Sequence, residues 1–159
     1  MEADIDYMRQ AIALAGRAAQ AGEVPVGAVL VYQGRVVGEG WNQPMSSCDP
    51  CAHAEVLALR AGGTELRNYR LGGTTLYVTL EPCTMCVGAI LHARVERLVY
   101  AAPDPKTGAV GSVFELLQDT RHNHRVRVHS GVLAGEASAL LSNFFLARRN
   151  HAKQGLAGR

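Results

Sequence analysis

Two short segments of the sequence carry side chains that can bind a metal and move protons. Cys83 and Cys86 stand three apart just after Pro82, where a run of β-type residues gives way to a helical pattern. The N-terminus of a helix favours thiolate over thiol, so both cysteines are suited to a soft metal. Upstream, His53 supplies an imidazole and Glu55 a carboxylate. Three protein ligands leave a tetrahedral zinc ion with one open position, which is typical of catalytic zinc.

These residues predict one zinc ion per chain and a hydrolytic reaction. Two thiolates and one neutral imidazole cancel the formal charge of zinc, so a base beside the attacking water becomes useful. We expect Glu55 to take a proton from that water and to return protons to a ring nitrogen and a departing amine. His53 and Glu55 are two apart and do not share a helix face, so the metal must lie off the end of their helix. The pattern predicts hydrolytic deamination of a heterocycle.

The cysteines allow two other interpretations. Cys48 and Cys51 form a second Cys-x-x-C pair, so a closed four-cysteine site would be a structural zinc. The 31 residues between the pairs, 52–82, exceed the usual spacing of about 15 to 20 in such sites, and His53 and Glu55 would have no role. A redox pair would lack a thioredoxin-like surround. We expect Cys48 and Cys51 to pack as small apolar side chains.

Composition predicts one folded domain over residues 1–159. Hydrophobic residues make up 48% of the chain, which is enough for a core. No apolar run reaches the roughly 20 residues of a membrane span, and the acidic N-terminus is unlike a signal peptide, so we expect a cytoplasmic protein with no membrane partner. The net charge is +2, yet the last twelve residues contain four basic side chains and no acid. A basic C-terminal helix and tail from about 136 would suit phosphate contacts, and a solvated tail is the alternative.

The elements that must position these residues alternate between helical and β patterns. The predicted helices run from Ile5 to near Gly22, from about Ala52 to Gly62–Gly63, from Cys83 to about Ala93, over 114–117, and from about Glu136 to Arg149. The predicted strands cover 24–32, 35–41, 75–80, 97–101 and 125–129.

The order of these elements predicts an α/β fold. Gln33-Gly34 can join the first two strands as an antiparallel hairpin, whereas the strand, helix and strand around Cys83 form a βαβ unit with parallel strands. Residues 103–112, with two prolines and two glycines, must be a loop at the C-terminal end of a strand, where ligands bind in open sheets. We expect a three-layer α/β/α sandwich around a five-stranded mixed sheet.

These motifs resemble a known family. The segments 53–55 and 82–86 are similar to the H-x-E and P-C-x-x-C signature of the zinc-dependent cytidine and deoxycytidylate deaminase superfamily. More narrowly, roughly residues 7–149 resemble the bacterial tRNA-specific adenosine deaminases (TadA), and Cys48 and Cys51 depart from that pattern. The stretches that carry this resemblance are 23–29, 40–42, 49–50, 77–86, 104–108, 111–112, 123–126, 144–145 and 148–149.

The resemblance implies a fold, a reaction and partners. The fold is cytidine deaminase-like, and the reaction converts the wobble adenosine of a tRNA anticodon loop to inosine and releases ammonia. Zinc is held by His53, Cys83 and Cys86, and Glu55 is the catalytic carboxylate. The partners are the anticodon stem-loop of tRNA and a second copy of the chain, in a homodimer. The implied substrate-binding residues are Asn42 at the purine edge, the backbone N–H of Ala54 at the reacting oxygen, and Asp104, Lys106, Asn123, Phe145, Arg148 and Arg149 on neighbouring nucleotides.

Two other functions remain compatible with the zinc motif. A deaminase of a free base or nucleoside, such as guanine or cytosine, would share the chemistry but would not need the basic C-terminal helix or the loop of Asp104. A non-catalytic, zinc-stabilised RNA-binding module would leave Glu55 beside an open zinc position without a role.

Overall fold

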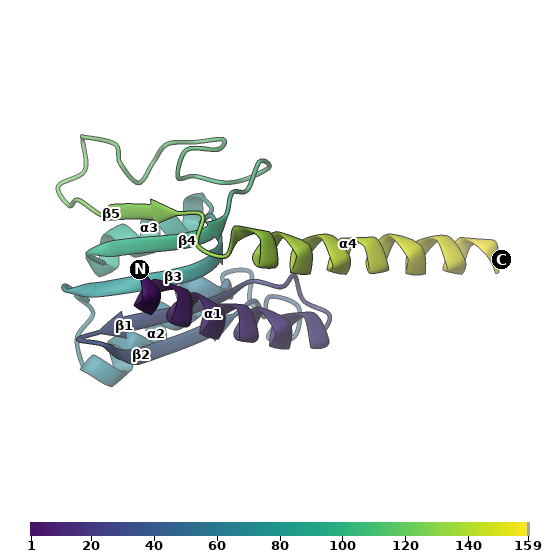
Figure 1. The fold of residues 1–159 in the computed structure, drawn as a ribbon, viewed down its shortest axis with the longest axis horizontal. Helices are drawn as coiled ribbons and strands as arrows, with labels where there is room; N and C mark the ends of the chain where they lie inside the picture. The colour runs from purple at the N-terminus through teal and green to yellow at the C-terminus, as the bar shows by residue number, and fades with distance from the viewer. Residues whose placement is uncertain (159) are drawn as a thin grey trace.

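A computed structural model of the chain describes residues 1–158. It contains one five-stranded sheet of order β2-β1-β3-β4-β5 and four helices (Figure 1). The strands are β1 (Gly27–Tyr32), β2 (Arg35–Trp41), β3 (Thr74–Leu80), β4 (Arg97–Ala102) and β5 (Arg127–Ser130). The helices are α1 (Glu2–Gln20), α2 (Ala54–Leu66), α3 (Thr84–Ala93) and α4 (Ala134–Ala157). None of these helices is long and apolar enough to span a membrane.

The sheet is mixed, as predicted. β1 pairs with β2 and with β3 in antiparallel fashion, and β3, β4 and β5 are parallel to one another. At the β1–β2 turn, Gln33 and Gly34 have φ angles of 50° and 74°. Positive φ at both central residues matches the right-handed twist of a two-residue hairpin, which confirms the predicted turn.

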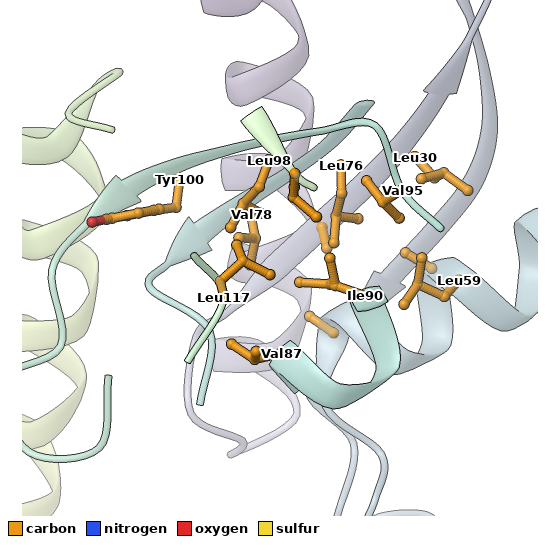
Figure 2. Close-up of a cluster of buried hydrophobic side chains, with 14 of the residues drawn as sticks. Leu30, Leu59, Leu76, Val78, Val87, Ile90, Val95, Leu98, Tyr100 and Leu117 are labelled. Atoms are coloured by element: carbon orange, nitrogen blue, oxygen red, sulfur yellow. The ribbon is translucent and has the colours of Figure 1, made fainter. Parts of the chain in front are cut away.

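Two apolar clusters, one on each face of the sheet, make three layers. Met8 and Leu14 of α1 pack with Val29 and Val99 on one face. On the other face the side chain of Ile90 in α3 points toward the sheet among the core side chains drawn in Figure 2. Helix α1 crosses one face in Figure 1, and α2 and α3 cover the other. The predicted α/β/α sandwich is confirmed.

Glycines on β2 let α2 lie close against the sheet. A Cβ atom at Gly40 would stand 2.2 Å from the carbonyl oxygen of Ala54, in the first turn of α2. Helix α2 also continues to Leu66, so its predicted end at Gly62–Gly63 is wrong. A Cβ atom at Gly62 would lie 2.3 Å from a methyl group of Leu30. Gly62 therefore serves close packing of helix on strand rather than helix termination.

The segment after the 103–112 loop differs from the prediction. No helix forms over 114–117, because the chain folds back onto the loop: the N–H of Phe114 donates to Gly108 at 3.0 Å, and that of Leu116 donates to Ala109 at 3.1 Å. Strand β5 begins at 127, two residues later than expected.

Helix α4 starts at 134 and ends at 157, beyond its predicted limit at Arg149. Its far half extends away from the sheet in Figure 1, and every residue of 145–158 is exposed. The first turns of this helix pack against the body of the protein, and further along only surface side chains are described in contact with it: Phe145 and Arg149 line a cavity, and Arg148 lies against Met45.

Candidate active site

The predicted metal ligands come together from two helix N-termini. His53 is the N-cap residue directly before α2, and Cys83 is the N-cap residue directly before α3. Nδ1 of His53 lies 3.5 Å from Sγ of Cys83 and 3.6 Å from Sγ of Cys86. Side chains at these positions commonly cap the helix, but neither residue makes a capping hydrogen bond here. Both side chains point toward a common centre instead.

The spacing of the three ligand atoms fits a tetrahedral zinc ion. All three lie within 4.8 Å of one another. Zn–N and Zn–S bonds of about 2.05 and 2.3 Å at the tetrahedral angle would place nitrogen and sulfur about 3.6 Å apart. One imidazole and two thiols are also the donor types that zinc prefers. His53, Cys83 and Cys86 can therefore hold zinc with little rearrangement.

The electrostatics of the sulfur pair also favour a cation. A hydrogen bond from Cys86 lowers the pKa of Cys83 to about 4, and the neighbouring Cys83 raises the pKa of Cys86. The same Cys83 raises the pKa of His53. Two neighbouring thiolates are stabilised when a divalent cation compensates their charge, so a pair of this kind suits a metal ion.

Glu55 is buried beside this centre, in the first turn of α2. Burial is the main cause that raises its pKa to about 7, and the proximity of Cys83 acts in the same direction. A carboxyl group with a pKa near the working pH can both accept and donate a proton. The residue predicted as the proton carrier therefore has suitable acidity and position.

Asn42 and Ala54 are joined by a hydrogen bond. The backbone N–H of Ala54 donates to Oδ1 of Asn42 at 2.9 Å. This bond fixes the orientation of the Asn42 amide, since only its oxygen can accept the proton. The Nδ2 group of Asn42 is left to donate elsewhere. The predicted role of the Ala54 N–H at the reacting oxygen stays a prediction, because this N–H would have to be shared.

Four of the six residues expected to hold neighbouring nucleotides line one cavity of about 560 Å³. Asp104 and Lys106 belong to the loop that follows β4, and Phe145 and Arg149 belong to α4. The loop reaches the metal ligands, because the residues at positions 83 and 108 form an isolated β-bridge. Phe145 is 40% exposed, and its ring packs edge to face against Phe144 with 5.5 Å between ring centres, so part of the ring surface stays accessible for stacking.

Arg148 and Asn123 lie outside this cavity. The Arg148 guanidinium lies 5.3 Å from the ring centre of Phe144 and 3.8 Å from the sulfur of Met45. Asn123 accepts a hydrogen bond from Arg94 at 3.0 Å. Arg94 directly follows the C-terminus of α3, whereas the predicted metal ligands lie at its N-terminus. Within one chain, Asn123 is therefore about one helix length away from these ligands.

Cys48 and Cys51 take no part in the metal cluster. Both thiols are exposed, so the expectation that they pack as small apolar side chains is wrong. Within residues 1–158, the only cluster with metal-ligand spacing is the one formed by His53, Cys83 and Cys86. The four-cysteine alternative therefore has no support in the described residues.

The sequence alone did not predict a role for two buried carboxylates next to the site, those of Glu23 and Glu81. Glu23 accepts hydrogen bonds from the backbone of Met45 at 3.1 Å and from the hydroxyl of Ser46 at 3.2 Å. Glu81 accepts several from the loop of Asp104. An acid within an apolar run, as at Glu81 after β3, was the available signal.

Comparison with known proteins agrees with this fold and identifies a family. The family model described as the cytidine and deoxycytidylate deaminase zinc-binding region matches residues 1–102. The chain belongs to this family of zinc-dependent deaminases.

Three individual proteins show which members of the family this chain is similar to. The tRNA-specific adenosine deaminase of Haemophilus influenzae is 56% identical over 153 residues, which cover 96% of this chain and 88% of that protein. A structure from studies of A-to-I editing by tRNA:A34 deaminases at the wobble position of transfer RNA has a TM-score of 0.83 and 43% identity, and it covers 86% of this chain and 99% of that one. The guanine deaminase of Nitrosomonas europaea has a TM-score of 0.78 and 25% identity, and the match covers 88% of this chain and 83% of that one.

Proposed function

We propose that this chain is a zinc-dependent deaminase that converts the wobble adenosine in the anticodon loop of a tRNA to inosine and releases ammonia. The observation that carries the proposal is the cavity that Asp104, Lys106, Phe145 and Arg149 help to line, in which the loop of Asp104 is joined to the metal site by the β-bridge between positions 83 and 108. It combines cationic groups for phosphates with an exposed aromatic ring for a base, as recognition of single-stranded RNA requires. The names of the tRNA-specific relatives support the same substrate.

The reaction exchanges an amine for an oxygen at one ring carbon. Zinc, when held by His53, Cys83 and Cys86, would act as a Lewis acid that lowers the pKa of the attacking water. Glu55 takes a proton from the attacking water and delivers it to the ring nitrogen next to the reacting carbon. Glu55 then passes the second proton of the water to the amine, so that the C–N bond breaks and ammonia leaves.

The remaining site residues orient the substrate. The bond from Ala54 to Oδ1 of Asn42 aims the Nδ2 group of Asn42 as a donor, which suits an acceptor nitrogen on the purine edge. The adenosine leaves the base stack to reach this site. Phe145 stacks on a neighbouring base, and Lys106 and Arg149 meet phosphates. Arg148 lies against Met45 in the loop that follows Asn42, and its guanidinium meets a phosphate outside this cavity.

A second copy of the chain completes the assembly. Helices α2 and α3 and the segment after α2 border a groove of about 910 Å³, with Val56, Leu59, Leu71 and Ala89 among its lining residues. We propose that this groove forms the interface of a homodimer, which would also bring Asn123 of one chain near the site of the other. Because tRNA is a cytoplasmic molecule, the enzyme acts in the cytoplasm.

The direct test offers the purified, zinc-loaded protein a set of substrates in parallel. These are an anticodon stem-loop RNA with adenosine at the wobble position, the same RNA with guanosine there, and free guanine, cytosine, adenosine and cytidine. We expect inosine and an equal amount of ammonia from the adenosine RNA alone. Glu55→Gln keeps the side-chain shape but cannot accept the proton, so its rate should fall by at least about a thousandfold while it still binds the RNA.

Two results would contradict the proposal. Turnover of guanine without turnover of the RNA would keep the zinc chemistry but assign the chain to the free-base deaminases. An RNA complex that persists without any release of ammonia, in a protein with one zinc per chain, would favour the non-catalytic RNA-binding module. A solution mass of one chain rather than two would refute the homodimer.

A further inference from the structure

Glu81 is a buried carboxylate that the deamination itself does not use. It directly follows β3 and is only 2% exposed. Among residues 1–158 no lysine, arginine or histidine forms an ion pair with it. A buried charge without a counterion is unfavourable unless hydrogen bonds compensate the lost hydration. The groups that donate to Glu81 therefore indicate what it stabilises.

All of its donors come from the loop of residues 103–112. Oε1 accepts from the N–H of Asp104 at 3.2 Å and from the hydroxyl of Ser112. Oε2 accepts from the N–H of Val110 at 3.0 Å and from the N–H of Ser112 at 3.2 Å. Both oxygens act only as acceptors, and their partners span most of the loop. The loop is thus folded around one carboxylate.

The loop leaves no space around this carboxylate. A Cβ atom at Gly108 would lie 2.3 Å from Oε2 of Glu81, so only glycine fits that position without displacement. The next residue, Ala109, donates its N–H to the carbonyl of Pro82 at 2.9 Å. Glu81 and Pro82 immediately precede the metal ligand Cys83, so the loop is attached to the segment that carries the metal site.

We propose that Glu81 is a positioning residue that sets the substrate-binding loop at a fixed place relative to the metal ligands. The loop carries Asp104 and Lys106 into the 560 Å³ cavity. Without the acceptors of Glu81, the backbone N–H groups of Asp104, Val110 and Ser112 lose their partners and the loop moves away from this place. Substrate binding then weakens, while the chemistry at the metal continues. This inference rests on the proposed function, since it takes the cavity as the RNA-binding surface.

The variant Glu81→Gln tests the proposal. Glutamine has the same shape, but it replaces one acceptor oxygen by an NH₂ group that faces the N–H donors of the loop. For the stem-loop RNA we expect KM to rise at least about tenfold and kcat to change less than about threefold. Hydrogen exchange at the amides of Val110 and Ser112 should become faster. The zinc content should stay at one per chain.

Two controls separate positioning from general damage. Glu115→Gln makes the same chemical change in the same region, at an exposed side chain that accepts one bond, from the N–H of Gln118 at 3.2 Å. It should leave KM and amide exchange unchanged. Gly108→Ala displaces the loop from the carboxylate without altering any charge, so it should raise KM as Glu81→Gln does. Gly135→Ala, where an added Cβ meets nothing within 4 Å, is its control.

The possible results distinguish this inference from the proposed function. An unchanged KM with protected amides in Glu81→Gln would overturn the positioning role. A fall in kcat with KM unchanged would also overturn it, since Glu81 would then act on the chemistry. If Glu81→Gln does not fold, Gly108→Ala decides in the same assays. If the wild-type protein makes no inosine, the proposed function fails, and amide exchange in the two variants still tests whether Glu81 holds the loop.

Discussion

Asp4 allows a quantitative prediction about stability. Its carboxylate accepts two hydrogen bonds from Arg97, at 2.8 and 2.7 Å, and one from the hydroxyl of Tyr77 at 2.7 Å. The bond to Arg97 is the main cause that lowers the pKa of Asp4 from 3.8 to about 2. These contacts tie the first turn of α1 to β3 and β4, so they should contribute to global stability.

The magnitude follows from two independent arguments. The lowered pKa corresponds to about 2 kcal/mol of stability at neutral pH. Removing one partner of a fully buried pair costs about 3–5 kcal/mol, but the side chain of Arg97 is 27% exposed and water can partly rehydrate it. We therefore expect Asp4→Asn to destabilise the protein by about 2–3 kcal/mol, and its urea midpoint to fall by about 1 M.

The pH dependence of this difference provides a second test. The folded protein has the lower pKa, so the contribution of Asp4 is complete above the unfolded pKa and is lost as the pH falls through the folded one. Urea unfolding of both proteins should show the full difference at pH 6 and about half of it at pH 3. Asp6→Asn is the control, since its pair with Arg9 spans 3.5 Å between side chains that are both 63% exposed. A difference below about 0.5 kcal/mol at pH 6, or one independent of pH, would refute the reasoning.

Three further predictions concern the site. Gly40→Ala should push the first turn of α2 away from β2 and reduce zinc content and activity, because its Cβ would overlap the carbonyl of Ala54. Gly16→Ala, with open space around the added Cβ, should have no effect on zinc content. Equal zinc content in the two variants would contradict the packing argument. Arg149→Gln should weaken RNA binding and reduce the slope of log affinity against log salt by about one; an unchanged slope in a titration from low to high salt would place Arg149 away from phosphate. A strong chelator should abolish activity and lower the melting temperature, and added zinc should restore both; a chelated protein that keeps full activity would exclude the metal mechanism.

Local patterns were sufficient for the core elements and for the group of side chains that could hold the metal. The valine-rich run that ends at Tyr32 forms an interior strand that is buried on both faces. A strand of this kind needs apolar residues at successive positions, so its burial could be predicted from the run itself. The grouping of His53, Cys83 and Cys86 could be predicted because side chains at helix N-termini can converge on one centre, and their ligand atoms do lie within 4.8 Å of one another.

The errors arise where tertiary contacts decide local structure. A glycine pair usually ends a helix, but Gly62 is needed where α2 meets Leu30, and no local signal distinguishes these two uses. The helix expected over 114–117 does not form because its backbone groups bond to Gly108 and Ala109 instead. The position of Glu81 after an apolar run marks it as unusual, but its hydrogen-bond partners could not be predicted, because they lie in a loop more than twenty residues further along the chain.

The exposed far half of α4 has a thermodynamic consequence. Residues 145–158 are all exposed, and their contacts with the body described above are those of Phe145, Arg148 and Arg149. With so little core packing, the helix–coil equilibrium of this segment approaches that of an isolated peptide, which is only marginally favourable at such lengths. An RNA that binds Phe145 and Arg149 must then supply the free energy to order these turns, and its affinity depends on helix propensity at residues that it never touches. Gly155, with open space around it, costs about 1 kcal/mol relative to alanine. Gly155→Ala should stabilise the helical conformation of residues 145–158 before RNA binds, and so tighten RNA binding without adding a contact.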